Sequence, residues 1–116
     1  MTLFFLVIDA QTGRLTWVRA GHHPAFFYSP FRGCCGELGG EGLSLGVTED
    51  WEYKEYSSTA KPGEIFILTT DGVWETQNDK GKMFGQKRFK EIIGKNAALG
   101  AEGIRESIME AVVAFQ

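Results

Sequence analysis

The start of the chain carries two hydrophobic runs with the two-residue period of β-strands. Residues 3–8 are apolar at every position, whereas residues 14–19 alternate between a more apolar and a more polar face. The loop between them, residues 9–13, is polar and ends in glycine, which is typical of a hairpin. We therefore expect an antiparallel strand pair here. Since residues 3–8 are apolar on both faces, we expect a second sheet or helices to cover this strand above and below.

The middle of the chain predicts shorter strands separated by turns. Residues 25–28 are strand-like and stop before a proline, and residues 65–68 are a run of branched and aromatic side chains after a Pro-Gly turn. Residues 52–57 mix charged and aromatic side chains, as an exposed or edge strand does. The segment 31–42 is rich in glycine, so we expect a loop there with at most a short strand at residues 37–38.

The last third of the chain changes to the helical period. Residues 87–93 place apolar side chains at helical spacing and stop at Gly94, which we expect to cap the helix. Residues 101–115 form a second amphipathic pattern, with Glu102 near the positive N-terminal end. Its apolar face consists of Ile104, Ile108, Ala111, Val112 and Phe115. Antiparallel strands followed by two helices predict an α+β fold in which the helices cover one face of a sheet.

Composition and charge narrow the class of protein. With 116 residues and 43% hydrophobic side chains, the chain is long enough to be one domain, or part of one, with a core. A formal charge of −3 without a basic stripe gives no electrostatic reason to expect nucleic acid or an anionic membrane as partner. The apolar runs are too short for a membrane helix, so we expect a cytoplasmic location. Cys34 and Cys35 are adjacent, which disfavours a mutual disulfide or a zinc site and indicates thiols.

The strongest chemical signal lies where the apolar run 65–68 leads to Asp71 and Gly72. A carboxylate held at the end of a strand suits Mg²⁺ or Mn²⁺, which prefer oxygen ligands in octahedral geometry. Gly72 allows the chain to turn sharply after the acid. The same residues also fit a buried strand followed by an ordinary Asp-Gly turn, and the local pattern leaves both interpretations open.

Six short segments add information through their order and spacing along nearly the whole chain. They are Thr-Gly-Arg-Leu-Thr (12–16), Ala-Gly-His-His-Pro (20–24), Gly-Leu-Ser-Leu-Gly-Val (42–47), Lys-Pro-Gly-Glu (61–64), Thr-Asp-Gly-Val (70–73) and Phe-Gly (84–85). In this order they resemble the C-terminal part of the SpoIIE/RsbU-type serine phosphatases, relatives of the type-2C (PP2C) metal-dependent protein phosphatases. The shared order, rather than any single segment, carries the resemblance and favours the metal-site interpretation.

The resemblance implies a PP2C-like α-β-β-α sandwich with two Mn²⁺ or Mg²⁺ ions between its sheets. Family members hydrolyse phosphoserine or phosphothreonine, often on anti-sigma-factor antagonist proteins of bacterial regulatory systems. The reaction uses a water activated by the two metal ions and needs no covalent nucleophile. The resemblance therefore predicts a metal-dependent protein phosphatase with a phosphoprotein substrate.

The resemblance also assigns individual residues. The family's central metal-binding aspartate falls on Asp71, and Gly72 forms the supporting turn. His22 lies in the family's Ala-Gly-His-x-Pro segment, without an assigned role. Glu75 follows closely and is either an outer support of the metal site or a solvated loop acid. Because adjacent strand residues point to opposite faces, His22 and His23 cannot readily bind one ion together, and we expect at least one of them to be structural.

Two parts of the family's metal shell do not occur in residues 1–116: the Asp and Gly-His-Gly segment of the N-terminal half, and a later Asp-Asp-x-Thr segment. We therefore expect a single partial domain that lacks the N-terminal half and the final strand, with weak or absent metal binding and little activity by itself. Exposed sheet edges predict a homodimer or a larger assembly. The alternative functions are a non-catalytic protein-binding module on the same scaffold and a structural β-rich domain, which the ordered segments disfavour.

Overall fold

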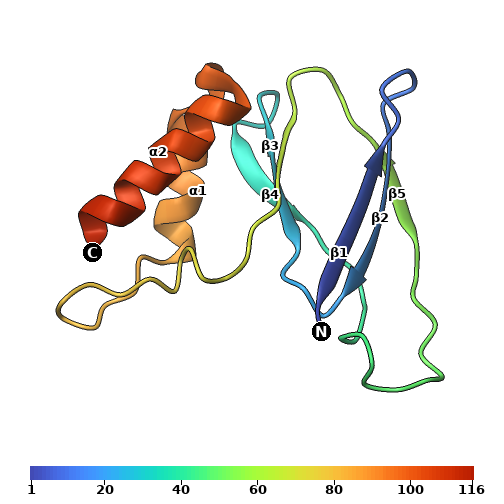
Figure 1. Cartoon of the computed structure of the whole chain (residues 1–116). Helices are drawn as coiled ribbons and strands as arrows, with labels where there is room; N and C mark the ends of the chain where they lie inside the picture. Colours follow the sequence, from blue (N-terminus) through green and yellow to red (C-terminus); the bar gives the residue numbers. More distant parts are fainter.

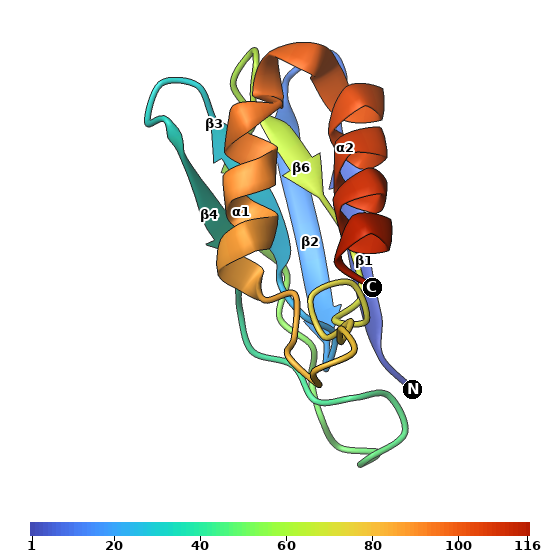
Figure 2. The same cartoon turned by 90° about the vertical axis from the view of Figure 1, so that its left-hand side faces the viewer.

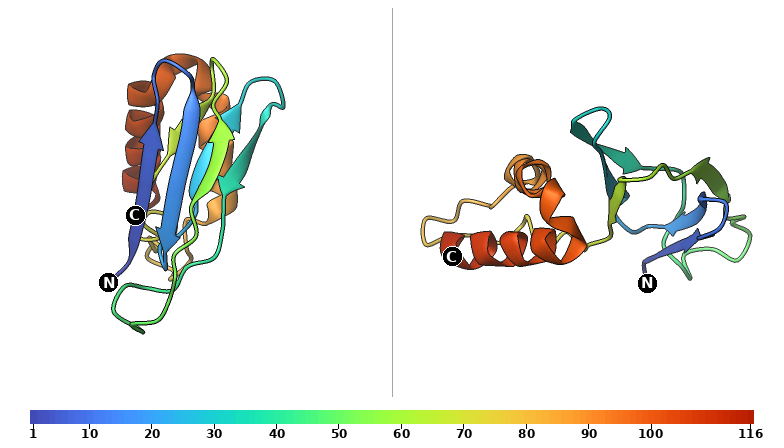
Figure 3. Two further views of the ribbon diagram at one scale, coloured as in Figure 1. Left: turned by 90° about the vertical axis from the view of Figure 1, so that its right-hand side faces the viewer. Right: turned by 90° about the horizontal axis from the view of Figure 1, so that it is seen from above.

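The computed structural model describes the backbone of residues 1–116 and every side chain except that of Cys34, so the thiol predicted there lies outside the described part. The chain forms three layers: two helices, a sheet next to them and a second sheet on the far side (Figure 1, Figure 3). The elements are β1 (Leu3–Ile8), β2 (Arg14–Ala20), β3 (Ala25–Ser29), β4 (Cys34–Leu38), β5 (Tyr56–Thr59), β6 (Ile65–Ile67), α1 (Gln86–Lys95), the short 3₁₀ helix η1 (Ala97–Leu99) and α2 (Gly100–Phe115). This confirms the predicted α+β fold. No helix of the described chain is both long and apolar enough to span a bilayer.

Each sheet has three strands, and all pairings between them are antiparallel. The strand order is β1-β2-β5 in one sheet and β4-β3-β6 in the other. The predicted N-terminal hairpin is confirmed, with Leu6 opposite Trp17. The Asp9 carboxylate closes its loop by accepting hydrogen bonds from the backbone N–H groups of Gln11 (2.9 Å) and Thr12 (3.3 Å).

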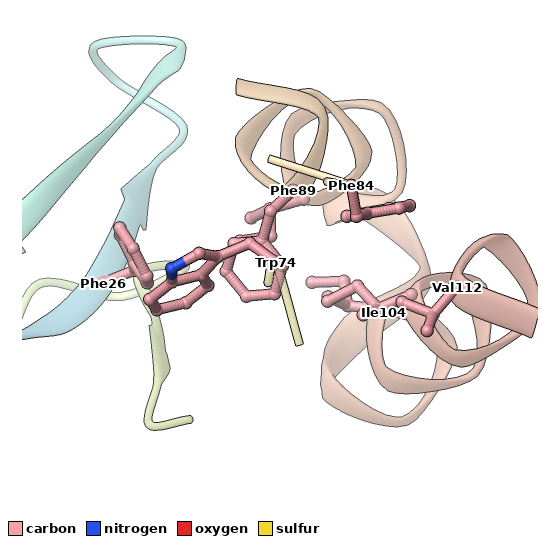
Figure 4. Close-up of a cluster of buried hydrophobic side chains, with 8 residues drawn as sticks. Phe26, Trp74, Phe84, Phe89, Ile104 and Val112 are labelled. Carbon is pink, nitrogen blue, oxygen red and sulfur yellow. The ribbon is translucent and has the colours of Figure 1, made fainter. Parts of the chain in front are cut away.

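Two hydrophobic clusters fill the spaces between the layers. The larger cluster lies between the helices and the β4-β3-β6 sheet, and Figure 4 shows its aromatic side chains meeting there. Its buried members are Phe26, Trp74, Phe84, Phe89, Ile93, Ile104, Ile108 and Val112. The smaller cluster lies between the two sheets, and its buried members are Leu15, Trp17, Ala25 and Leu38. The predicted apolar face of α2 is confirmed, because Ile104, Ile108 and Val112 all belong to the larger cluster.

The prediction of a loop over residues 31–42 is wrong in part, because β4 occupies Cys34–Leu38. Phe27 of β3 lies opposite Gly36 of β4, and a Cβ at Gly36 would come within 2.6 Å of the Phe27 ring. Pairing with β3 and the need for space beside this ring outweigh the low strand propensity of glycine. The strand predicted at residues 52–57 lies farther along, at Tyr56–Thr59, where it pairs with β2.

The end of α1 also differs from the prediction. The helix continues past Gly94 through Lys95 and is capped by Asn96. The Ile92 carbonyl accepts hydrogen bonds from both the backbone N–H of Asn96 (3.1 Å) and its side-chain Nδ2 (2.8 Å). Gly94 is therefore an interior helical residue and not the cap.

β1 is covered on one face within this chain. Phe4 and Leu6 are half-buried and pack against the smaller cluster. Leu3, Phe5 and Val7 alternate with them and are 45%, 57% and 49% exposed. The expectation of cover on both faces is thus wrong for this chain, since the second apolar face of β1 lies open.

Candidate functional site

Asp71 lies in a turn and not directly at the end of a strand. β6 ends at Ile67, residues 68–70 follow, and the Asp71 side chain is exposed. The backbone N–H of Glu75 donates to the Asp71 carbonyl (3.0 Å), which closes the turn. Trp74 of the same turn is 6% exposed and belongs to the larger hydrophobic cluster. The predicted strand-end position is therefore wrong, because the burial of Trp74, and not β6 itself, holds the turn in place.

Gly72 has an ordinary backbone conformation in this turn. Its φ is not positive, and the nearest atom to an added Cβ would be the Thr70 Oγ1 at 3.5 Å, an ordinary contact. The Thr76 hydroxyl donates to the Gly72 carbonyl (3.0 Å) and stabilises the turn. Within this chain the backbone does not demand glycine at position 72, and the supporting role of this residue stays a prediction.

A small cavity of about 140 Å³ brings Asp71 together with residues from the start of the chain. It is lined by Thr2, Gly21, His22, His23, Thr70 and Asp71. The histidines and Asp71 come together because β2 ends just before the histidines and β6 leads toward the Asp71 turn. Glu75 is exposed and does not line the cavity. The structure therefore brings two of the predicted site residues together and leaves Glu75 outside.

The two histidines of the cavity have different surroundings. The Nδ1 atoms of His22 and His23 lie 2.7 Å and 2.8 Å from the carbonyls of His23 and Pro24, respectively. Because a carbonyl can only accept, each Nδ1 is the donor in its contact, which leaves Nε2 as the acceptor in the neutral tautomer. His23 uses this acceptor toward the Gln86 amide (3.3 Å), and its ring packs 4.6 Å from Trp74. His23 is thus the structural histidine that the sequence led us to expect.

His22 keeps its Nε2 acceptor available. Its ring contacts Phe4 edge-on at 6.2 Å, and no hydrogen-bond partner for Nε2 is found among the described side chains. The Arg19 guanidinium donates through Nε to the His22 carbonyl and through Nη1 to the Gly40 carbonyl (2.9 Å), which fixes this segment against the loop after β4. Gly21 has a φ of 71°, and a Cβ there would meet Ser44 Oγ at 2.2 Å. The close approach of Gly21 to Ser44 and the two hydrogen bonds of Arg19 therefore hold His22 at the cavity.

Of the side chains that line this cavity, the Asp71 carboxylate and the His22 imidazole are the candidate metal ligands, because His23 is engaged by Gln86. Nowhere in the described chain do three His, Cys, Asp or Glu side chains come close enough to hold a metal ion. Mg²⁺ requires near-octahedral oxygen ligation, from carboxylates, phosphates and waters. Asp71 and His22 can supply ligands on one side of such an ion. They are too few to form a complete two-metal centre by themselves.

Two residues that support the site were missed in the sequence. For Trp74 the sequence did carry a usable signal: a tryptophan close to the Asp71–Gly72 pair, because so large a side chain tends to anchor the segment that carries it. Gln86 had no such signal. It begins α1 and reaches His23 across 63 positions of sequence, a contact that only the folded chain creates.

Comparisons with known proteins place these features in a family. The Phosphoserine phosphatase RsbU of Bacillus subtilis (strain 168) is 25% identical over 116 residues, which cover 100% of this chain and 34% of that protein. Protein IcfG of Synechocystis sp. is 33% identical over 101 residues, which cover 87% of this chain and 16% of that protein. The chain thus spans about a third, or less, of these relatives.

Solved structures show the same fold. The SiaA-PP2C domain of Pseudomonas aeruginosa matches with a TM-score of 0.82 and 21% identity, over 99% of this chain and 45% of that one. The PP2C phosphatase domain of SpoIIE from Bacillus subtilis, with a fragment of its regulatory domain, matches with a TM-score of 0.75 and 20% identity, over 99% of this chain and 33% of that one. The chain therefore has part of the PP2C fold. Since the family model for Stage II sporulation protein E (SpoIIE) matches residues 1–116, the chain belongs to the SpoIIE family.

Proposed function

We propose that this chain is the C-terminal part of a metal-dependent protein phosphatase domain that hydrolyses phosphoserine or phosphothreonine on a bacterial regulatory protein of the anti-sigma-factor antagonist type. The observation that carries the proposal is the shared cavity of Asp71 and His22, in a chain that matches the SpoIIE family along its whole length. The name of the relative RsbU, a phosphoserine phosphatase, supports the substrate class. Such a substrate is an intracellular protein, so the proposal also places the chain in the cytoplasm.

In this proposal each residue has a defined task. The Asp71 carboxylate is a ligand of Mn²⁺ or Mg²⁺, and the buried Trp74 keeps its turn in position. Bound metal supplies a water activated for attack on phosphorus. The Nδ1–H of His22 donates to the His23 carbonyl, which directs Nε2 to the cavity as a ligand atom, an arrangement typical of histidines that serve a metal site. Glu75 lies outside the cavity and supports the turn through its backbone.

We propose further that residues 1–116 form one partial domain, in which the missing ligands leave metal binding weak and hydrolysis low. The alternative function, a non-catalytic protein-binding module on the same scaffold, is favoured by the small donor set of one carboxylate and one imidazole. The two functions differ in what they require of Asp71, because a metal ligand is essential to hydrolysis and dispensable for simple protein binding.

The test combines a binding and an activity measurement on the whole chain. Mn²⁺ binding is followed by electron paramagnetic resonance, and hydrolysis of p-nitrophenyl phosphate is followed in parallel. Asp71→Ala is compared with Asp79→Ala, which removes another exposed acid from a different turn. We expect weak Mn²⁺ binding that is lost in Asp71→Ala and kept in Asp79→Ala, with hydrolysis close to background.

The outcomes separate the parts of the proposal. Equal Mn²⁺ binding by Asp71→Ala and the parent chain would show that Asp71 is not a ligand. Tight stoichiometric Mn²⁺ binding, or hydrolysis that depends on Asp71, would show instead that the chain or its assembly completes the metal centre, and the claim of an incomplete site would be wrong.

The exposed second face of β1 and its unpaired edge lead us to propose self-association as a homodimer or a larger assembly. Phe5 is the most exposed side chain of this face, at 57%. Apolar strand edges of this kind are usually hidden by another chain or element.

A further inference from the structure

A second surface lies beside the candidate site: a groove of about 550 Å³ between the β3–β4 hairpin and α1. Figure 2 shows α1 alongside β3 and β4. Tyr28 and Gly94 form part of the groove, and Lys87, Lys90, Glu91 and Lys95 give it its charge. We propose that this groove binds an acidic, partly apolar segment of a protein. The inference rests on the proposed function, because a phosphatase that acts on a protein gains specificity from contacts away from the phosphate.

The charge of the groove differs in sign from that of the chain. Three lysines and one glutamate line it, and Glu37 pairs with Lys90, which gives a net charge of +1 from 3 − 2, whereas the chain as a whole carries −3. The ion pairs among the described side chains are Lys54–Glu41 (3.2 Å) and Lys90–Glu37 (3.6 Å). Lys87 and Lys95 are therefore exposed cations without an acidic partner in the described chain. This local charge complements an acidic ligand and not a basic one.

The fourth basic residue of α1 shows that not every cation of this helix is available. The Arg88 guanidinium lies 5.3 Å from the ring centroid of Phe84 and 4.7 Å from that of Phe115. These cation–π contacts join α1 to the end of α2. Arg88 thus has a structural role on one side of the helix. Among the described side chains, Lys87 and Lys95 of the groove make no cation–π contact.

Gly94 gives the groove its depth. It is an exposed residue inside a helix, where glycine is unfavourable relative to alanine. No packing requires it, since an added Cβ would have Tyr28 Cε2 as its nearest neighbour at 3.8 Å, an ordinary contact. Across the groove, a Cβ at Gly33 would meet nothing within 4 Å. Gly33 has a φ of 65°, which by itself favours glycine, whereas at Gly94 the absence of a side chain leaves room for a ligand beside Tyr28.

The groove also leads away from the candidate site. Gln86, the first residue of α1, contacts His23 on the Asp71 cavity, and Lys87 follows directly. A helix of ten residues extends for about 15 Å, so the lysines extend from the cavity along that length. In the proposal, a segment bound along α1 continues past Gln86 toward the Asp71 cavity, as the flanking sequence of a phosphorylated residue would.

The experiment measures binding directly, without metal and without hydrolysis. The probe is a fluorescein-labelled synthetic peptide that alternates Glu and Leu, and the control is the same peptide with Lys in place of Glu. Fluorescence anisotropy with the whole chain at low salt should show binding of the Glu peptide alone. The double variant Lys87→Glu/Lys95→Glu should weaken it by about tenfold, because two attractive charges become repulsive.

A matched variant controls for overall charge. Lys80→Glu/Lys82→Glu changes the net charge equally on an exposed turn and should leave the dissociation constant within about twofold. Gly94→Gln keeps the charge and the helix, fills the groove, and should weaken binding by about threefold or more. Circular dichroism confirms that each variant is folded.

Three results would overturn the inference: equal weakening by the two double variants, unchanged binding in both Lys87→Glu/Lys95→Glu and Gly94→Gln, or equally tight binding of a single-stranded RNA oligonucleotide, which would assign the surface to nucleic acid. Because the assay contains no metal, loss of peptide binding is distinguishable from failure of Asp71 to bind Mn²⁺, which would refute the proposed phosphatase site instead.

Discussion

Gly94 and Gly100 give opposite predictions for the same substitution. Gly94 lies inside α1 without a positive φ, and a Cβ there would make only an ordinary contact, 3.8 Å from Tyr28 Cε2. An exposed glycine within a helix is about 0.8–1 kcal/mol less favourable than alanine. Gly94→Ala should therefore raise the free energy of unfolding by about that amount.

Gly100 joins η1 to α2 with a φ of 77° and a ψ of −177°. This region of backbone conformation is nearly restricted to glycine, and a residue with a Cβ costs about 1–3 kcal/mol there. An added Cβ would meet nothing within 4 Å, so the cost comes from the backbone alone and not from a clash. Gly100→Ala should therefore lower the free energy of unfolding.

Urea unfolding followed by tryptophan fluorescence measures both variants on the same scale. In thermal unfolding, about 1 kcal/mol corresponds to a change of about 4 °C in Tm for a chain of this size. If Gly94→Ala destabilised the chain as much as Gly100→Ala, Gly94 would have the left-handed conformation of a helix cap, and the continuation of α1 to Lys95 would be refuted.

Two further predictions concern the hairpin and the assembly. Hydrogen bonds from the backbone of Gln11 and then of Thr12 lower the pKa of Asp9 from its ordinary value of 3.8, so its stabilising effect is present above pH 3.8 and is lost as the pH falls through the lower folded value. Urea unfolding across this range should show a shallower acid dependence in Asp9→Asn, and an identical dependence would exclude this role. In light scattering, the chain should show a mass above that of the monomer that falls in Phe5→Lys, whereas a monomer at all concentrations would contradict self-association through β1.

The elements that the sequence predicted well are those determined by local pattern. The alternation and the polar loop around Asp9 identify the hairpin, and the period of Ile104, Ile108 and Val112 identifies the buried face of α2. These signals need no knowledge of distant residues. The ordered family segments likewise identify Asp71 as a candidate from the sequence alone.

The errors arise where distant parts of the chain decide the outcome. β4 forms among glycines because β3 offers a pairing partner and Phe27 needs the space above Gly36. The position of Asp71 depends on the burial of Trp74 under α1, and the different hydrogen-bond partners of His22 and His23 depend on Gln86. None of these contacts leaves a periodic signal in the sequence, so only the fold reveals them.

The side chains of β3 alternate between the two cores, so this strand is part of both. Phe26 and Tyr28 contact the core under the helices, whereas Ala25 and Phe27 contact the core between the sheets. Opening either core leaves this strand held by the other, so its amides should be among the last to exchange with solvent. His22 and His23 directly precede β3, which means that one wall of the cavity is attached to a strand that both cores hold in place.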